Sequence, residues 1–205
     1  MKCGKPIQSD EQEYCYDCSR FEYAFEQGRS LWVHKQPVSG AIYQYKFHNR
    51  RCYAAVFARE IVAKYGGWIE EKRIDAIIPV PLHWRKKRKR GFNQAELLAE
   101  YILKELKEQG SSRKDVMSAS DIIVLKKVLF RVKNTKPQKL LDDRDRQLNL
   151  QGAFRVSEKW NPVQTVLLVD DIYTTGATIH RIAKQLKKAG VQKVYFLTIS
   201  IGQGL

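Results

Sequence analysis

The stretch that decides the fold class is Thr165-Val166-Leu167-Leu168-Val169-Asp170-Asp171-Ile172-Tyr173-Thr174-Thr175-Gly176-Ala177-Thr178. It begins with a continuous apolar run, which is typical of a strand buried on both faces of a sheet. Two adjacent acids, a short threonine-rich turn and an amphipathic helix follow in that order. A strand that leads through a turn into a helix is typical of a parallel α/β sheet, in which ligands bind at the carboxyl ends of the strands.

The turn has the chemistry of a phosphate site. Gly176 allows the backbone to approach a ligand, the threonine hydroxyls donate hydrogen bonds, and the helix N-terminus offers free N–H groups and partial positive charge. The preceding acids suit sugar hydroxyls, or a Mg²⁺ ion held by the substrate. A simpler interpretation is that the acids cap the helix and the threonines satisfy the turn. The joint occurrence of strand, acids, turn and helix favours the ligand site.

The rest of the chain alternates between strand and helix patterns. We expect strands at 41–45, 74–81, 122–132, 165–169 and 193–201, and the break at Lys126-Lys127 could divide 122–132 into two short strands. We expect helices at 50–65, ending at Gly66-Gly67, and at 93–110, 137–148 and 178–189. This alternation predicts an α/β fold, with a mostly parallel sheet and helices on both faces.

The composition indicates a polyanionic partner. The 205 residues carry 37 Lys and Arg against 22 Asp and Glu, a net charge of +15. Nucleic acid, an anionic membrane surface and phosphorylated substrates all fit such a charge. The sequence contains neither an apolar stretch long enough to span a membrane nor the apolar centre of a signal peptide, so we expect a cytoplasmic protein.

A run of six cations follows the strand expected at 74–81. It consists of Arg85, Lys86, Lys87, Arg88, Lys89 and Arg90. A charge run is usually a solvated face, but this one leaves the carboxyl edge of the sheet and should border the ligand site. We expect a loop there that contacts a nucleic-acid backbone, with Trp84 and Phe92 stacking on bases. Substrate pyrophosphate is the competing anion, and further cations that extend the patch are Arg131, Lys133, Lys136 and Lys139.

Three of the four cysteines lie near the start of the chain. Cys15 and Cys18 have the spacing of a zinc knuckle, and Cys3 resembles half of a second one. The cysteines predict a zinc module at 1–20, with a closed structural site; reduced cysteines in a tail are the alternative. A fourth ligand could come from upstream of Met1, or from Cys52, His34 or His48, although Cys52 lies on an apolar stripe and is expected in the core. Residues 21–40 are then a connecting segment or hood, and 41–205 the main domain.

The 165–178 stretch matches the PRPP-binding signature of type I phosphoribosyltransferases, and the chain as a whole resembles the ComF family of competence proteins. The resemblance extends over most of residues 1–201. It is supported by residues 135–138 and 146–154 and by the stretches Lys46-Phe47-His48, Asp75-Ala76-Ile77-Ile78-Pro79-Val80-Pro81-Leu82 and Arg90-Gly91-Phe92-Asn93-Gln94-Ala95.

The resemblance implies roles for specific residues. Asp170 and Asp171 would bind the ribose hydroxyls of PRPP, and Lys46, near the end of the first strand, would lie by the pyrophosphate. The 5-phosphate would be held by Thr174, Thr175, Gly176, Ala177 and Thr178. Mg²⁺ would accompany PRPP, zinc would be structural, and no catalytic residue is identified.

The resemblance also implies a role in natural transformation. The protein would handle imported single-stranded DNA, together with a DNA-uptake helicase or other competence proteins. A non-enzymatic platform for nucleic acid and protein is the alternative, and nucleobase salvage is a weaker one. The sequence leaves open whether PRPP is turned over, and onto which acceptor.

Overall fold

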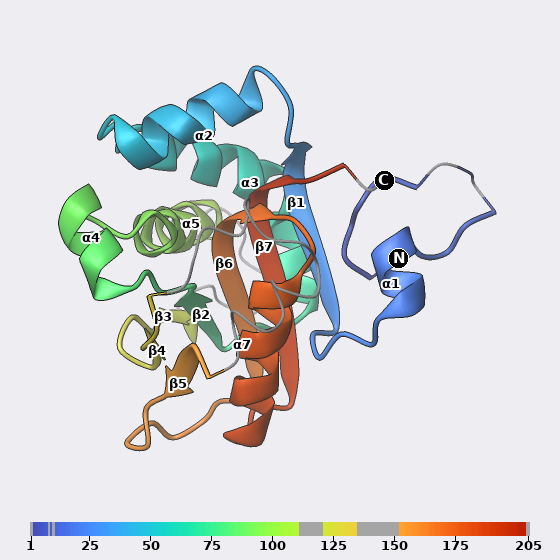
Figure 1. Cartoon of the computed structure of the whole chain (residues 1–205), viewed down its shortest axis with the longest axis vertical. Helices are drawn as coiled ribbons and strands as arrows, with labels where there is room; N and C mark the ends of the chain where they lie inside the picture. Colours follow the sequence, from blue (N-terminus) through green and yellow to red (C-terminus); the bar gives the residue numbers. More distant parts are fainter. Residues whose placement is uncertain (1, 8, 10, 111–120, 135–151, 204–205) are drawn as a thin grey trace.

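A five-stranded parallel sheet forms the centre of the molecule in the computed structural model, which describes residues 2–7, 9, 11–110, 121–134 and 152–203 (Figure 1). The strand order is β1-β7-β6-β2-β3, and a separate antiparallel hairpin pairs β4 with β5. The strands are β1 (Gln27–Val33), β2 (Ala76–Pro79), β3 (Ile123–Val124), β4 (Leu129–Arg131), β5 (Phe154–Val156), β6 (Thr165–Tyr173) and β7 (Lys193–Ile201). The helices are α1 (Tyr16–Arg20), α2 (Val38–Phe47), α3 (Tyr53–Glu71), α4 (Trp84–Arg90), α5 (Gln94–Gly110) and α7 (Ala177–Lys188).

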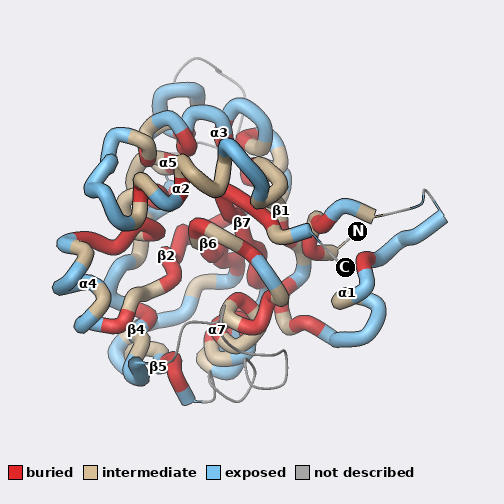
Figure 2. Tube along the Cα trace, turned by 45° about the horizontal axis from the view of Figure 1, so that its top comes forward, coloured by how far each residue is buried: buried red, intermediate tan, exposed pale blue. Residues whose placement is uncertain are grey.

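The sheet is buried on both faces, which explains the continuous apolar runs of its central strands. In β6, Val166 and Leu168 pack into one hydrophobic cluster, while Leu167 and Val169 pack into the other. Helix α7 covers the first face, and helices α3 and α5 cover the second. Buried residues accordingly follow β2, β6 and β7 in Figure 2, with exposed residues on the outer turns of the helices. The predicted α/β fold with helices on both faces of a parallel sheet is confirmed.

Several predicted elements are also confirmed. The strands expected at 74–81 and 193–201 are β2 and β7, and the helices expected at 93–110 and 178–189 are α5 and α7. The 122–132 stretch is divided, as its central lysines suggested, into β3 and β4. The helix expected at 137–148 lies outside the described residues. No helix in the described part of the chain combines the length and apolar character needed to cross a membrane.

The strand expected at 41–45 is wrong, because these residues belong to helix α2. Ile42 and Tyr45 are buried at helical spacing, and the Tyr45 ring contacts Phe57 of α3 and Phe92. Tyr45 also donates a hydrogen bond to the carbonyl of Gln94, with 2.7 Å between oxygens. Packing on one face of a helix therefore outweighs the local strand pattern.

The end of a helix at Gly66-Gly67 is wrong as well, since α3 continues to Glu71. Ile69, beyond the glycines, is completely buried in the core. Each glycine costs a helix about 1 kcal/mol relative to alanine, whereas burying one isoleucine side chain stabilises by about 1.5–3 kcal/mol. Core packing beyond the glycines thus offsets their cost, and the helix continues.

The first strand of the sheet lies within the range expected to be a connecting segment. Residues 27–33 form β1, which pairs in parallel with β7 at the edge of the sheet. Gly28 is required there, because a Cβ atom on it would lie 2.0 Å from the ring of Phe196. The strand was missed in the sequence because Gly28, Arg29 and Ser30 interrupt its apolar pattern.

Candidate functional site

Strand β6 carries the two acids to the carboxyl edge of the sheet and extends beyond them to Tyr173. The backbone N–H of Asp171 donates to Oδ1 of Asp170 across 2.8 Å. Oδ1 of Asp171 forms an ion pair with Nζ of Lys46, also at 2.8 Å, and both side chains are largely buried. The second oxygen, Oδ2 of Asp171, is buried and has no hydrogen-bond partner among the described residues. This arrangement leaves one carboxylate oxygen available to a ligand.

Lys46 lies in the last turn of helix α2, so its predicted position near the end of a strand is wrong. It nevertheless reaches the acid pair, as the ion pair with Asp171 shows. The structure therefore brings together Lys46, Asp170 and Asp171 from two different elements.

The turn after β6 depends on Gly176. This residue has φ of +77°, in the left-handed region, and a Cβ atom on it would lie 2.3 Å from the hydroxyl oxygen of Tyr173. The carbonyl of Gly176 accepts a hydrogen bond from the N–H of His180, and this bond closes the first turn of helix α7. Thr174 is exposed, Thr175 and Thr178 are half-buried, and Gly176 and Ala177 are buried.

One hydroxyl of this turn lacks a partner. Oγ1 of Thr175 is buried, and it has no hydrogen-bond partner among the described residues. A buried polar atom without a partner costs free energy, so a ligand that supplied one would be favoured. Asp171, Tyr173 and Thr175 thus each have one such oxygen among the described residues.

Two arginines from other elements share the electrostatic environment of the acids. Burial lowers the pKa of Arg90, at the end of α4, and the charges of Asp171 and Asp170 oppose this effect. Burial likewise lowers the pKa of Arg131, on β4, with Asp170 opposing it. Together with Lys46, they form a cationic border around a pair of acids. Such a border suits a ligand that combines hydroxyl and anionic groups.

Burial and the neighbouring Asp171 raise the pKa of Asp170 to about 7. Its hydrogen bond from the Asp171 N–H, and the charges of Lys46 and Arg131, act in the opposite direction. The ionised form of Asp170 is therefore less favourable than that of an ordinary aspartate. A hydroxyl or cation that contacted this carboxylate would relieve the penalty.

The basic run is a helix, so the predicted loop is wrong. Residues 84–90 form α4, in which Nδ1 of His83 accepts from the N–H of Arg85, and Gly91 with φ of +83° ends the helix. Helix formation divides the run into two faces, because residues four apart lie on the same side. Lys86 and Arg90 are half-buried on one side, and the exposed residues are Arg85, Lys87, Arg88 and Lys89.

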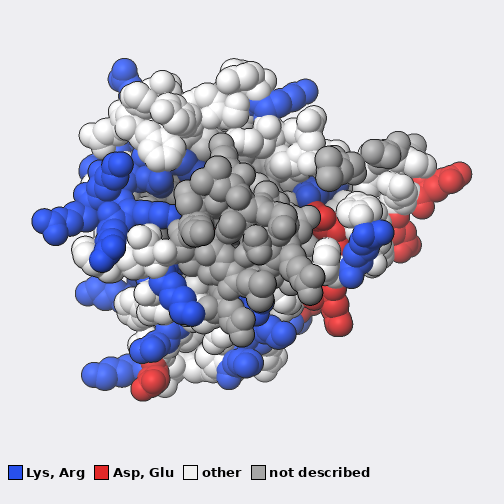
Figure 3. Space-filling view, viewed as in Figure 1, with Lys and Arg blue, Asp and Glu red and all other residues white. Residues whose placement is uncertain are grey.

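The exposed cations belong to a larger positive surface. In the orientation of Figure 3, Lys and Arg side chains cover the side that carries α4, while acidic side chains gather on the opposite side near the N-terminus. Lys87 is partly neutralised, since its Nζ lies 2.9 Å from a carboxylate oxygen of Glu96. Arg85, Arg88 and Lys89 are thus the run's cations best placed for an external polyanion.

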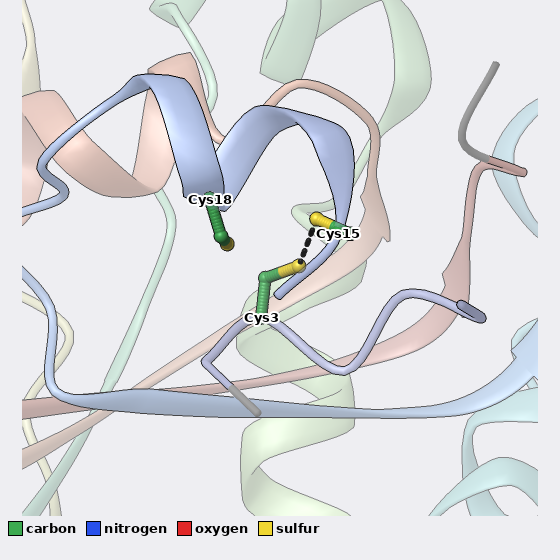
Figure 4. Close-up of side chains that lie close together, drawn as sticks. All are labelled: Cys3, Cys15 and Cys18. Atoms are coloured by element: carbon green, nitrogen blue, oxygen red, sulfur yellow. Dashed lines mark hydrogen bonds between the residues drawn. The ribbon is translucent and has the colours of Figure 1, made fainter. Parts of the chain in front are cut away.

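The three N-terminal cysteines form one cluster, drawn in Figure 4. Their sulfur atoms all lie within 4.8 Å of one another, and those of Cys3 and Cys15 are 3.3 Å apart. A hydrogen bond with Cys18 and burial raise the pKa of the Cys3 thiol, whereas the same bond lowers that of Cys18. Three converging soft ligands fit a zinc ion, as predicted from the sequence.

The alternatives for a fourth zinc ligand within the chain do not reach this cluster, which contains only these three ligands among the described residues. Nδ1 of His34 lies 2.9 Å from Oγ of Ser200, and the ring of His48 packs on Tyr43. Cys52 is exposed at the start of α3, so its expected place in the core is wrong. The helix begins at Tyr53, three residues later than expected, which leaves Cys52 outside the packed stripe.

Comparison with known proteins identifies the family, although no family model matches the chain. The chain is 32% identical over 200 residues to Competence protein F of Haemophilus influenzae, covering 94% of this chain and 80% of that protein. It is 31% identical over 201 residues to DNA utilization protein YhgH of Escherichia coli K12, covering 94% and 79%. The chain belongs to the ComF family. It is also 25% identical over 194 residues to Competence protein ComFC of Bacillus subtilis, covering 92% and 71%.

In this ComF-family chain, a groove of about 890 Å³ separates α4 and the start of α5 from the β4–β5 hairpin. Two large aromatic rings line it and remain accessible: Trp84 is 59% exposed and Phe130 is 44% exposed. Phe92, which was expected to stack on bases, is only 8% exposed and packs on Tyr45, so that expectation is wrong. The cations that line the groove are Lys87, Lys126, Lys127, Arg131, Arg155 and Lys159.

Sequence reasoning missed Phe130 and Arg155 in this groove. They lie on the two strands of a hairpin whose connection spans residues 132–153, so no local pattern joins them. Of the cations predicted to extend the patch, Arg131 lines the groove and Lys133 does not, whereas Lys136 and Lys139 lie outside the described residues.

Proposed function

We propose that this ComF-family protein binds the ribose 5-phosphate end of PRPP with Mg²⁺ and acts in handling single-stranded DNA during DNA uptake. Asp170 and Asp171 accept hydrogen bonds from the ribose hydroxyls, and the 174–178 turn binds the 5-phosphate. Lys46, Arg90 and Arg131 neutralise the pyrophosphate. The observation that carries the proposal is the group of buried oxygens without described partners, Asp171 Oδ2 and Thr175 Oγ1 together with the Tyr173 hydroxyl.

The donor set is compatible with Mg²⁺ beside this site. Mg²⁺ prefers oxygen ligands and is commonly held by substrate phosphates together with one or two carboxylates. The free oxygen of Asp171 is such a group. When bound, the ion would neutralise charge on the pyrophosphate.

The DNA part of the proposal is supported by the relatives and by the surface. The names of the relatives refer to competence and to DNA utilization. The exposed face of α4 and the groove beside it combine cations with accessible rings, the pairing that binds single strands without reading their sequence. Cytoplasmic location and contact with other DNA-uptake proteins belong to the same proposal.

The test of the sugar-phosphate site is the double variant Asp170→Asn with Asp171→Asn. We expect PRPP affinity in calorimetry with Mg²⁺ to fall at least about ten-fold, because two charge-assisted hydrogen bonds are weakened. The control is Glu71→Gln with Glu108→Gln, which removes two acids of exposed surface ion pairs and changes the net charge equally. Equal PRPP affinity in the Asn variant and this control would contradict the proposal. Pyrophosphate release with candidate acceptors then separates an enzyme from a binding platform.

A further inference from the structure

Residues 23–26 connect the N-terminal module to both ends of helix α7. The hydroxyl of Tyr23 donates to the backbone carbonyl of Thr175, with 2.7 Å between the oxygens. The N–H of Ala24 donates to Nδ1 of His180 across 3.0 Å, and the Tyr23 ring packs edge-on against that imidazole. Glu26 forms an ion pair with Lys187 in the last turn of α7. The segment therefore holds the turn and the helix that follows it.

The same segment packs against the cysteine cluster. Cys3, Cys15 and Tyr23 are buried in one hydrophobic cluster, which also contains Tyr173 and Ala177 of the candidate phosphate turn. The Tyr23 ring stacks on the Phe25 ring, with 5.0 Å between the ring centroids. The Phe25 ring in turn packs edge-on against the Tyr173 ring, with 6.3 Å between the centroids. Tyr23 is thus buried in the same cluster as Cys3 and Cys15, while its hydroxyl reaches the turn.

The hydrogen bond from Tyr23 fixes the direction of a peptide group. A trans peptide is planar, so the N–H of Gly176 points away from the carbonyl of Thr175. Holding that carbonyl toward Tyr23 therefore sets the orientation of the Gly176 N–H on the other side of the peptide plane. A turn that binds an anion through backbone N–H groups depends on such an orientation.

We propose that Tyr23 is a positioning residue that couples metal binding at Cys3, Cys15 and Cys18 to anion binding at the 174–178 turn. Metal orders the module, the module holds Tyr23, and Tyr23 holds the Thr175–Gly176 peptide in the anion-binding orientation. Coupling between two sites is reciprocal, so an anion in the turn strengthens metal binding by the same factor. The anion part of this inference rests on the proposed function, whereas the effect of metal on the turn does not.

The first measurement needs no ligand. Hydrogen exchange of peptides covering 174–178 is compared with zinc and after chelation, in the wild-type protein, in Tyr23→Phe and in Tyr65→Phe. Tyr65 is a matched control, because its hydroxyl also donates to a backbone carbonyl, that of Ser30 at 2.8 Å, in the other core cluster. We expect chelation to speed exchange in the turn roughly five-fold or more in the wild type and the control, and to have little effect in Tyr23→Phe.

The second measurement uses ribose 5-phosphate as the probe. We expect it to slow zinc release to a chromogenic chelator in the wild type and in Tyr65→Phe, but not in Tyr23→Phe. Coupling in Tyr23→Phe equal to that of the control overturns the proposal, and so does a wild-type turn whose exchange is independent of zinc. A zinc-dependent turn in a protein that does not bind ribose 5-phosphate leaves the positioning role of Tyr23 in place and overturns the proposed sugar-phosphate site.

Discussion

Asp170 and Asp171 are adjacent in the chain and share the fields of Lys46 and Arg90, but of the two only Asp171 forms a described ion pair. Successive side chains of a strand point to opposite faces of the sheet, so the two acids lean toward different neighbouring elements at the same edge. Asp171 is directed to Lys46 of α2, while Asp170 lies in the field of Arg131 on the β4–β5 hairpin. The sequence predicted the acid pair because strand, acids and turn are contiguous. It did not predict the places of the cations, which depend on how α2 and the hairpin pack.

The raised pKa of Asp170 predicts a pH-dependent effect of Asp170→Asn on stability. A carboxyl whose pKa is raised to about 7 by folding destabilises the folded state when it ionises. We expect the variant to be more stable than the wild type above pH 7, by about 1–3 kcal/mol, because remaining solvent access reduces the full shift. Below a pH of about 4 the carboxyl is protonated in both states, and the difference should vanish.

The measurement is urea unfolding of both proteins between pH 4 and 8. The difference in unfolding free energy should grow as pH rises through this range and stop growing above about pH 7. A variant that is less stable than the wild type at pH 8 would show that Asp170 is ionised without penalty.

At the scale of elements, the strongest sequence patterns were the most reliable. Strand β7 and helix α7 were predicted within one residue of their bounds, since a segment rich in β-branched and aromatic residues and a regular apolar stripe each favour one structure. Helix α2 was mistaken for a strand, because its short apolar pattern fits both periods. Its helical form depends on contacts with Phe57 and Phe92, which no local pattern contains.

Helix α4 predicts that two functions separate on its two faces. Replacing the exposed Arg85, Arg88 and Lys89 by alanine should weaken binding to all single-stranded oligonucleotides alike. Each phosphate contact on a single strand contributes about 0.7 to the slope of log K against log salt. Loss of three contacts should therefore flatten that slope by roughly 2 units. Fluorescence anisotropy across a salt series measures both effects, and PRPP affinity should be retained.

Substitutions on the half-buried face of α4 should affect PRPP binding more than DNA binding. Lys86→Ala with Arg90→Ala should weaken PRPP binding more than DNA binding, because Arg90 shares the field of the acid pair. The charge control is Lys184→Ala, Lys188→Ala and Lys193→Ala, which removes three exposed cations of α7 and β7. If this control flattens the salt slope as much as the α4 variant does, the DNA contact does not belong to α4.

At the scale of the whole molecule, the N-terminal module is packed against the main sheet. Its predicted separation from 41–205 came from a change in composition near residue 20, which is a local signal. The packing of Cys3, Cys15 and Tyr23 against residues of β6 and α7 is a tertiary feature that composition does not reveal. The cluster of the three cysteines, in contrast, was predicted, since knuckle spacing itself brings two thiols together.

This packing predicts that metal loss affects the stability of the entire protein. Cys15→Ser should abolish the roughly one equivalent of zinc that we expect in the purified protein. The unfolding midpoint should fall by roughly 5–10 °C, since a ligand that stabilises the core cluster is lost. The exposed Cys52→Ser is the matched control and should change neither zinc content nor midpoint. Elemental analysis and calorimetry check both, and a zinc-free Cys15→Ser protein with the wild-type midpoint would contradict the coupling of module and core.

The position of β1 beside β7 has a consequence for synthesis on the ribosome. The two strands are parallel partners, with Gln27 opposite Tyr195 and Val33 opposite Ile201. At the usual rates of translation, β7 is synthesised roughly 10–30 s after β1, because the two strands are about 170 residues apart in the chain. Metal can join the cysteines in that interval, before Thr175 has been made and Tyr23 has a carbonyl to hold. We therefore predict that the nascent chain can bind zinc before its 174–178 turn has been made.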